Sequence, residues 1–155
     1  MKKLKNETAF QKLIRRSLAY CYFERCKFKK NHGSEFTGKG VADIDGHAGG
    51  YYVAIEAKMW GNRPSPAQAA FMRRVMVTGG MALFLIYKFR DGEHSFHWVP
   101  GDLPFSYRTS SIWIKSGLLL APVDPANPGK DKIEIIDCSP IMTLINIRNS
   151  NAKST

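Results

Sequence analysis

The sequence predicts an α/β protein with a small mixed β-sheet flanked by helices. Three observations predict this fold class: a pair of strand-like segments at 41–46 and 51–59 around a Gly-rich turn, an amphipathic segment at 66–78, and a continuously apolar run at 81–87. Strands joined by a tight turn pair antiparallel, whereas a helix between two strands is a crossover, expected to be right-handed. The residues alone therefore give the order α-β-β-α-β-β, followed by an irregular C-terminal third.

The first predicted element is a helix from about residue 6 to 22. Asn6 can cap it and Glu7 lies in its first turn. Apolar residues recur at helical spacing from Phe10 to Cys21, which gives the helix one buried face. The basic segment that follows contains Cys26 and Phe28 and is either a short strand or an extended arm, ending in glycines that mark turns.

The two strands of the predicted hairpin carry the chemistry. Side chains alternate between the faces of a strand, so 51, 53, 55 and 57 form an apolar face for a core. Glu56 and Lys58 share the other face. A hairpin brings Asp43, thirteen residues before Glu56, beside them. Two acids and a lysine therefore meet at one end of the sheet.

The remaining elements follow from turn signals. Ser65 and Pro66 begin the helix at 66–78, whose inward residues we expect to be Ala67, Ala70, Phe71 and Val75. The apolar run at 81–87 predicts a strand buried on both faces, and a strand at 94–99 follows it. Beyond residue 100 we expect a helix turn within 110–117, a strand at 132–137 and a helix from 139 to about 148. Residues 1–148 then form a single domain, with a disordered tail at 149–155.

Composition favours a polyanionic partner. The chain has 23 basic and 13 acidic residues and a formal charge of +10, which favours nucleic acid through counterion release. Three cysteines without metal-ligand spacing predict reduced thiols in a cytoplasmic protein. His94 and His97 would face opposite ways on a strand, which argues against a zinc site. The longest apolar run is too short to span a bilayer.

The acids and the lysine predict hydrolysis of a phosphodiester. Mg²⁺ prefers oxygen ligands and keeps several waters, so one or two carboxylates can hold it. We expect Asp43 and Glu56 to be its ligands, with the carbonyl oxygen of Ala57 as a third, and Mn²⁺ as a substitute metal. Lys58 would orient or polarise the attacking water or stabilise the pentacovalent phosphorus. The alternative is that Asp43 is a turn residue and Glu56 and Lys58 form an ion pair on a solvated face.

Three motifs in order resemble those of the PD-(D/E)xK nuclease superfamily: Gly40-Val-Ala-Asp43, Ile55-Glu-Ala-Lys58 and Arg63-Pro-Ser-Pro-Ala-Gln68. They are most similar to the Holliday-junction-resolvase branch, with its RecU-like and VRR-NUC-like members, over about residues 38–100. The resemblance implies a restriction-endonuclease-like αβββαβ core, dependence on Mg²⁺ and often a homodimer.

The resemblance also assigns roles to residues. It implies that Asp43 and Glu56 bind the metal, that Lys58 is the catalytic lysine, and that Gln68 is the helix glutamine near the site. Glu7 matches the N-terminal helix acid that many members direct toward the metal. One departure is Ala42, which stands where the family has proline.

Basic residues flank the motifs in the sequence. We expect contacts with the DNA backbone from Arg63, on the loop after the second hairpin strand, and from further cations: Lys27, Lys29, Lys30, Lys39, Arg73 and Arg74. Trp60 is a candidate for stacking on an unpaired base.

The leading functional hypothesis is a Mg²⁺-dependent endonuclease of branched DNA, a Holliday junction resolvase acting in DNA recombination and repair. A nicking or flap nuclease with the same core is one alternative. A catalytically inactive nucleic-acid-binding module is another, although such a module has no need of two acids beside a phosphate. An RNA-directed basic protein is a third alternative, without any supporting RNA-binding motif.

Overall fold

The computed structural model describes residues 1–21, 28–31 and 41–154. The predicted arm around Cys26 and the glycines at 33, 38 and 40 lie outside these ranges. The elements in chain order are α1 (Glu7–Cys21), β1 (Lys29–Lys30), β2 (Ile44–Ala48), β3 (Tyr51–Met59), α2 (Pro66–Val77), β4 (Met81–Arg90), β5 (Glu93–Pro100), the 3₁₀ helix η1 (Tyr107–Ile112), β6 (Ile114–Ser116), β7 (Leu118–Pro122), β8 (Lys132–Ile136) and α3 (Ser139–Lys153).

Strands β1 to β6 form one mixed sheet in sequence order. The pair β3–β4 is parallel and is joined by α2, while the other four pairs are antiparallel. The turn between β2 and β3 uses Gly49 and Gly50, both with positive φ, as a tight hairpin turn requires. The short β1 completes the expected order αβββαβ, and the predicted mixed sheet flanked by helices is confirmed.

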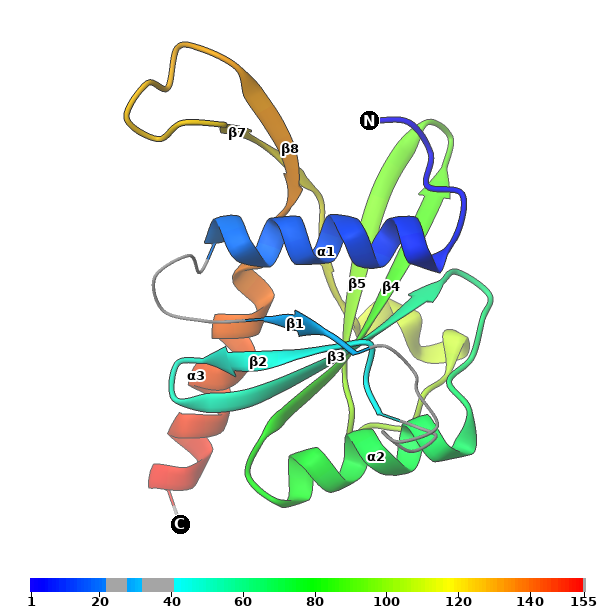
Figure 1. Ribbon diagram of the computed structural model, residues 1–155. Coiled ribbons are helices and arrows are strands. Elements are labelled where there is room, and N and C mark those ends of the chain that lie inside the picture. Colours follow the sequence, from blue (N-terminus) through cyan, green and yellow to red (C-terminus); the bar gives the residue numbers. More distant parts are fainter. Residues whose placement is uncertain (22–27, 32–40, 155) are drawn as a thin grey trace.

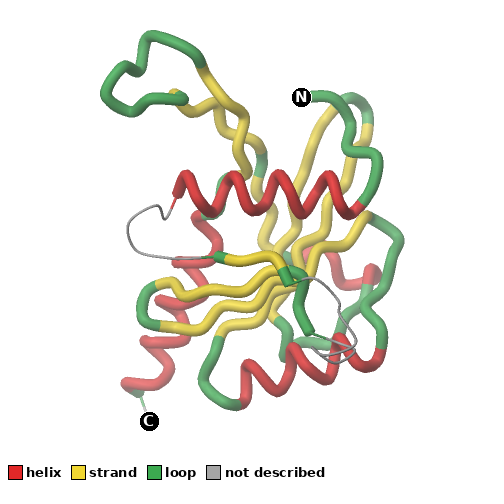
Figure 2. The backbone as a smooth tube through the Cα atoms, viewed as in Figure 1, coloured by secondary structure: helices red, strands yellow, loops and turns green. Residues whose placement is uncertain are grey.

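Helices cover both faces of the sheet, as Figures 1 and 2 show. On one face α1 and α3 pack against the predicted apolar side of β3, with Val53, Ile55 and Ala57 in the core. On the other face α2 and the segment around Trp113 enclose a second core that includes Ala54. The interior of β4 is buried on both sides, as its continuous apolar run predicts.

The N-terminal ends of α1 and α2 follow their capping residues. Ala9 N donates to Asn6 Oδ1 at 2.9 Å, and Ser65 and Gln68 form a complete capping box. The predicted inward face of α2 is wrong at Ala67 and Ala70, which are exposed. Val75 is buried as predicted and Met72 is buried as well, because the first turn of α2 directs Gln68 toward Glu56 rather than an apolar residue toward the core.

The C-terminal third is more regular than its sequence predicts. Instead of a helix turn at 110–117, η1 ends at Ile112 and 114–116 extend the sheet as β6. The prediction of a disordered tail is wrong for residues 149–153, because α3 continues to Lys153. Side-chain contacts hold this helix: Tyr51 donates to Asn149, and Arg148 donates at 2.6 Å to the carbonyl oxygens of Met76 and Gly80. No helix in the described ranges combines the length and apolarity that crossing a bilayer requires.

His97 on β5 makes stability depend on pH. Burial, together with the charges of Lys115 and Lys88, lowers its pKa to about 4, and its Nδ1 has no hydrogen-bond partner among the described residues. The unfolded chain takes up a proton near pH 6.5 and the folded chain does not, so stability is lost as the pH falls from about 6.5 toward 4.

We therefore expect His97→Gln, which cannot titrate but can still bond to Ser95, to remove part of the acid destabilisation. Between pH 7.5 and 4.5 the wild type should lose roughly 2–3 kcal/mol more than the variant. Urea unfolding at both pH values measures this. Parallel losses in the two proteins would contradict the assignment to His97.

Candidate functional site

Asp43 and Glu56 meet at the end of β3 where β2 begins. The hairpin register pairs Ile44 with Ile55, which sets Asp43 beside Glu56. Ala57 N donates to Asp43 Oδ2 at 2.9 Å, and Asp43 N donates to Glu56 Oε2 at 3.2 Å. Each acid is thus held by the backbone of the other strand, and the predicted convergence of Asp43 with Glu56 is present.

Lys58 and Gln68 both hydrogen-bond to the carboxylate of Glu56. Lys58 Nζ donates to Glu56 Oε1 at 2.9 Å, and the Gln68 side-chain amide donates to the same oxygen. Glu56 is 1% exposed and Lys58 is 7% exposed. The alternative of an ion pair on a solvated face is therefore wrong: the pair is buried, with α2 over it.

In the site, burial and nearby negative charges disfavour ionisation of the two carboxyl groups. Burial raises the pKa of Glu56 to about 7, and the charge of Asp43 contributes, against the opposing effect of Lys58. Burial also raises the pKa of Asp43, and the charge of Glu7 adds to this. For Lys58 burial acts in the opposite direction, but the hydrogen bond to Glu56 and the acidic charges outweigh it and raise the pKa. Lys58 is therefore a permanent cation at neutral pH, not a general base.

These residues fit a hard divalent cation with an open coordination sphere. Burial raises the pKa of both carboxyls, the half-buried Asp43 and the buried Glu56, and a nearby cation would stabilise them in the ionised form. Across the described ranges, however, no three His, Cys, Asp or Glu side chains form a metal-binding group. Asp43 and Glu56 would thus hold Mg²⁺ with water completing its shell. Direct ligation by Glu7 and by the Ala57 carbonyl stays a prediction.

Helix α1 contributes two side chains to the site. Glu7 Oε1 lies 4.0 Å from Lys58 Nζ and accepts a hydrogen bond from Asn62 Nδ2 at 3.2 Å. The Gln11 side chain lies beside the carboxyl of Asp43 and acts to lower its pKa, against the larger effect of burial. The sequence reasoning missed Gln11, although its position four residues after Glu7 places both on one helix face. It is 8% exposed, unusually buried for a glutamine.

The loop after β3 is held by Tyr107, a second residue that the sequence reasoning missed. Its hydroxyl donates to Asn62 O at 2.7 Å and accepts from Gly61 N at 3.0 Å. Because Asn62 also donates to Glu7, Tyr107 fixes a loop that leads from β3 into α2 and contacts α1 at the site. No local signal in the sequence links Tyr107 to this loop.

The predicted DNA contacts are dispersed. Arg63 is exposed on the loop near Tyr107. Burial raises the pKa of Tyr107, and the charge of Arg63 opposes this rise. Arg73 and Arg74 are exposed on α2. Lys29 and Lys30 lie on β1, while Lys27 and Lys39 lie outside the described residues.

Asp45, two residues after Asp43, belongs to a separate polar group. Its carboxylate accepts from Tyr52 Oη at 2.8 Å and from Asn31 Nδ2 at 3.1 Å, and lies 4.0 Å from Lys29 Nζ. These contacts occupy both oxygens of Asp45. Lys29 is therefore placed beside an acid that the structure engages in contacts of its own.

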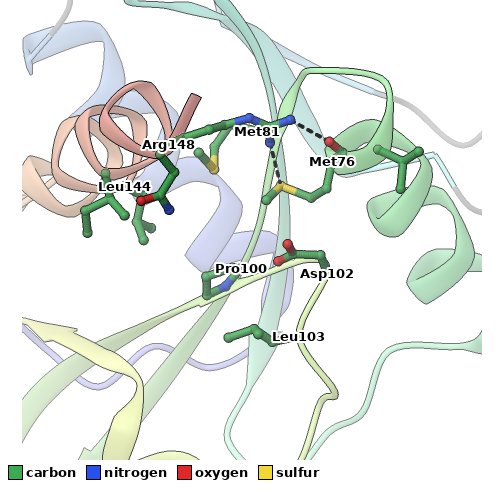
Figure 3. A pocket seen from close by; sticks show the side chains of 10 residues that line it. Met76, Met81, Pro100, Asp102, Leu103, Leu144 and Arg148 are labelled. Carbon is green, nitrogen blue, oxygen red and sulfur yellow. Dashed lines mark hydrogen bonds between the residues drawn. The ribbon is translucent and has the colours of Figure 1, made fainter. Parts of the chain in front are cut away.

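A hollow of about 330 Å³ lies between α2, the sheet and α3 (Figure 3). Apolar side chains such as Met81 and Leu144 line most of it, and Arg148 crosses one side to reach Met76. Asp102 is its single acidic residue among those described. It therefore offers no second cluster of carboxylates.

Comparisons with known proteins give a distant structural likeness. No family model matches the sequence, and no curated protein gives a significant match. Among solved structures, one match is Hjc, a Holliday junction resolvase from the hyperthermophilic archaeon Archaeoglobus fulgidus. It is 18% identical with a TM-score of 0.43, over 62% of this chain and 81% of that chain. A likeness this distant assigns neither a family nor a function to the chain.

Proposed function

We propose that this protein is a Mg²⁺-dependent endonuclease of branched DNA, and specifically a Holliday junction resolvase. The observation that carries the proposal is the convergence of the half-buried Asp43 with the buried Glu56 and Lys58 at one end of the sheet. The three motifs that resemble the resolvase branch support the choice of substrate, and the net charge of +10 supports a polyanion.

In the proposed reaction the chain's own groups bind and orient. Asp43 and Glu56 hold the cation, while Gln68 and Ala57 N keep the two carboxylates in place. The bound cation supplies charge neutralisation at phosphorus and lowers the pKa of water. Lys58, a permanent cation, binds a non-bridging phosphate oxygen and stabilises the charge that develops there. Glu7 and Gln11 orient Lys58 and Asp43 from α1.

A homodimer is part of the proposal, because a four-way junction presents two symmetric strands and a C₂ dimer matches that symmetry. The C-terminal third offers exposed apolar side chains for an interface, namely Ile112, Leu119 and Leu120. Trp113, the neighbour of Ile112, is buried in the second core and lies outside this patch.

Cleavage of a labelled four-way junction in Mg²⁺ tests the proposed function, beside flap, duplex and single-stranded DNA of the same sequence. We expect symmetric paired nicks across the junction, slower cleavage of the other substrates, and no cleavage in EDTA. Faster cleavage of the flap would favour the flap-nuclease alternative. Metal-independent cleavage, or binding without cleavage of any substrate in Mg²⁺ or Mn²⁺, would refute the proposal.

A further inference from the structure

We propose that a basic groove beside the candidate site binds the sugar–phosphate backbone of the DNA arm next to the cleaved strand. The groove encloses about 520 Å³ and is lined chiefly by Lys3, Met59, Trp60, Lys88, Phe89 and Arg90. None of these residues belongs to the motifs or to the contacts expected from the sequence, apart from Trp60. The choice of DNA as the ligand rests on the proposed function, but the groove itself does not.

The groove carries three cations, from Lys3, Lys88 and Arg90, and no acidic residue of the described chain lines it. Arg90 Nε lies 3.3 Å from Asp91 Oδ2, but both side chains are largely exposed, so this pair is weak and yields readily to a phosphate. Three positive charges along one concave surface, one of them only weakly paired, are complementary to successive phosphates rather than to a neutral ligand.

Aromatic side chains hold two of these cations in place. Lys88 Nζ lies 3.8 Å from the ring centroid of Trp60, and Lys3 Nζ lies 5.7 Å from that of Phe89. Trp60 is itself fixed by Tyr107, at 4.8 Å between ring centroids, and by His97 at 5.2 Å. A cation over a ring keeps N–H groups for a phosphate while losing little further side-chain entropy on binding.

This arrangement changes the role expected of Trp60. One face of its indole is covered by the ammonium group of Lys88, and the ring also contacts those of Tyr107 and His97. We infer that Trp60 positions Lys88 rather than stacking on a base.

A continuous set of contacts joins the groove to the candidate site. Trp60 follows Lys58 by two residues, and its backbone N donates to Tyr87 O at 2.8 Å on β4. Tyr107 contacts Trp60 and also fixes Asn62, which donates to Glu7 beside Lys58. Figure 1 shows the end of β3, the first turn of α1 and the hairpin of β4 and β5 together on one side of the molecule. A strand bound at Lys58 can therefore continue into the groove.

Binding without cleavage tests this inference. The probe is a fluorescein-labelled four-way junction in EDTA, titrated at several salt concentrations with Lys88→Ala/Arg90→Ala and with the wild type. Loss of two phosphate contacts should weaken binding roughly 10- to 60-fold at about 0.1 M salt and reduce the slope of log K against log[salt] by about 1.5 to 2. The matched control is Lys130→Ala/Lys153→Ala, which removes two exposed cations on other surfaces.

The outcomes separate the groove from the nuclease activity. Weaker binding and a smaller slope in the groove variant alone support the inference, even if no substrate is ever cleaved. Equal weakening in the control would show that net charge alone acts, and would overturn it. Wild-type binding by the groove variant would also overturn it, whether or not the junction is cleaved. Competition by polyglutamate as effective as that by duplex DNA would identify an acidic protein ligand instead.

Discussion

Asp43→Asn is expected to reduce the rate of DNA cleavage roughly 1,000-fold or more, because the variant removes one of two charges that hold the cation. The fold should survive, since asparagine is isosteric and its side-chain oxygen can still accept from Ala57 N. The charge of Asp43 raises the pKa of Glu56, so its removal relieves repulsion in the site. Junction binding in Ca²⁺ or EDTA should therefore be retained.

The matched control for this prediction is Asp45→Asn, the same substitution two residues along the chain. Asp45 bonds to Tyr52 and Asn31 and lies outside the site, so its variant should cleave at close to the wild-type rate. Mn²⁺ titration by calorimetry should show binding by the wild type and the control, and weak or no binding by Asp43→Asn. Equal cleavage by Asp43→Asn and the wild type in a pure preparation would remove Asp43 from the proposed mechanism.

Lys58→Met is expected to have the second largest effect, a loss of roughly 100- to 1,000-fold in cleavage rate, typical for removal of one group that stabilises charge in a transition state. Methionine preserves the length and apolar stem of lysine, so packing at this buried position changes little. Because the pKa of Lys58 is raised, the wild-type side chain is charged throughout the working pH range.

Metal binding distinguishes this variant from Asp43→Asn. Removing the positive charge beside Glu56 removes a competitor for its Oε1 atom, so Mn²⁺ should bind Lys58→Met at least as tightly as the wild type. The control is Lys130→Met on an exposed loop, which should behave as the wild type in both assays. If Lys58→Met cleaved at the control rate, Lys58 would be a structural counter-ion of Glu56 and the proposed mechanism would be wrong.

Local sequence patterns were sufficient for the hairpin and the two acids. Alternation in 51–59 placed Glu56 and Lys58 on one face, and the glycines at 49 and 50 set a turn that brings residue 43 beside residue 56. Both are short-range effects, because strand periodicity and turn geometry act within about a dozen residues. The cap at Ser65 likewise predicted where α2 begins.

Long-range contacts could not be predicted in the same way. Gln11 reaches Asp43 across the layer between α1 and the sheet, and Tyr107 reaches Asn62 from 45 residues away. The buried face of α2 was partly misassigned because Gln68, in its first turn, is directed toward Glu56. The tail was misassigned because Arg148 and Asn149 bond to other elements, and their own sequence carries no sign of those partners.

The sequence alone determined that this chain is an α/β protein and that the alternation and turn of its strands set Asp43 beside Glu56. Only the tertiary structure decided that Glu56 and Lys58 are buried, that α1 brings Gln11 beside Asp43, and that Lys88 lies over the ring of Trp60. The physical reason is that side-chain alternation along a strand and the geometry of a tight turn depend on neighbouring residues, whereas burial and charge depend on which distant segments the core brings together.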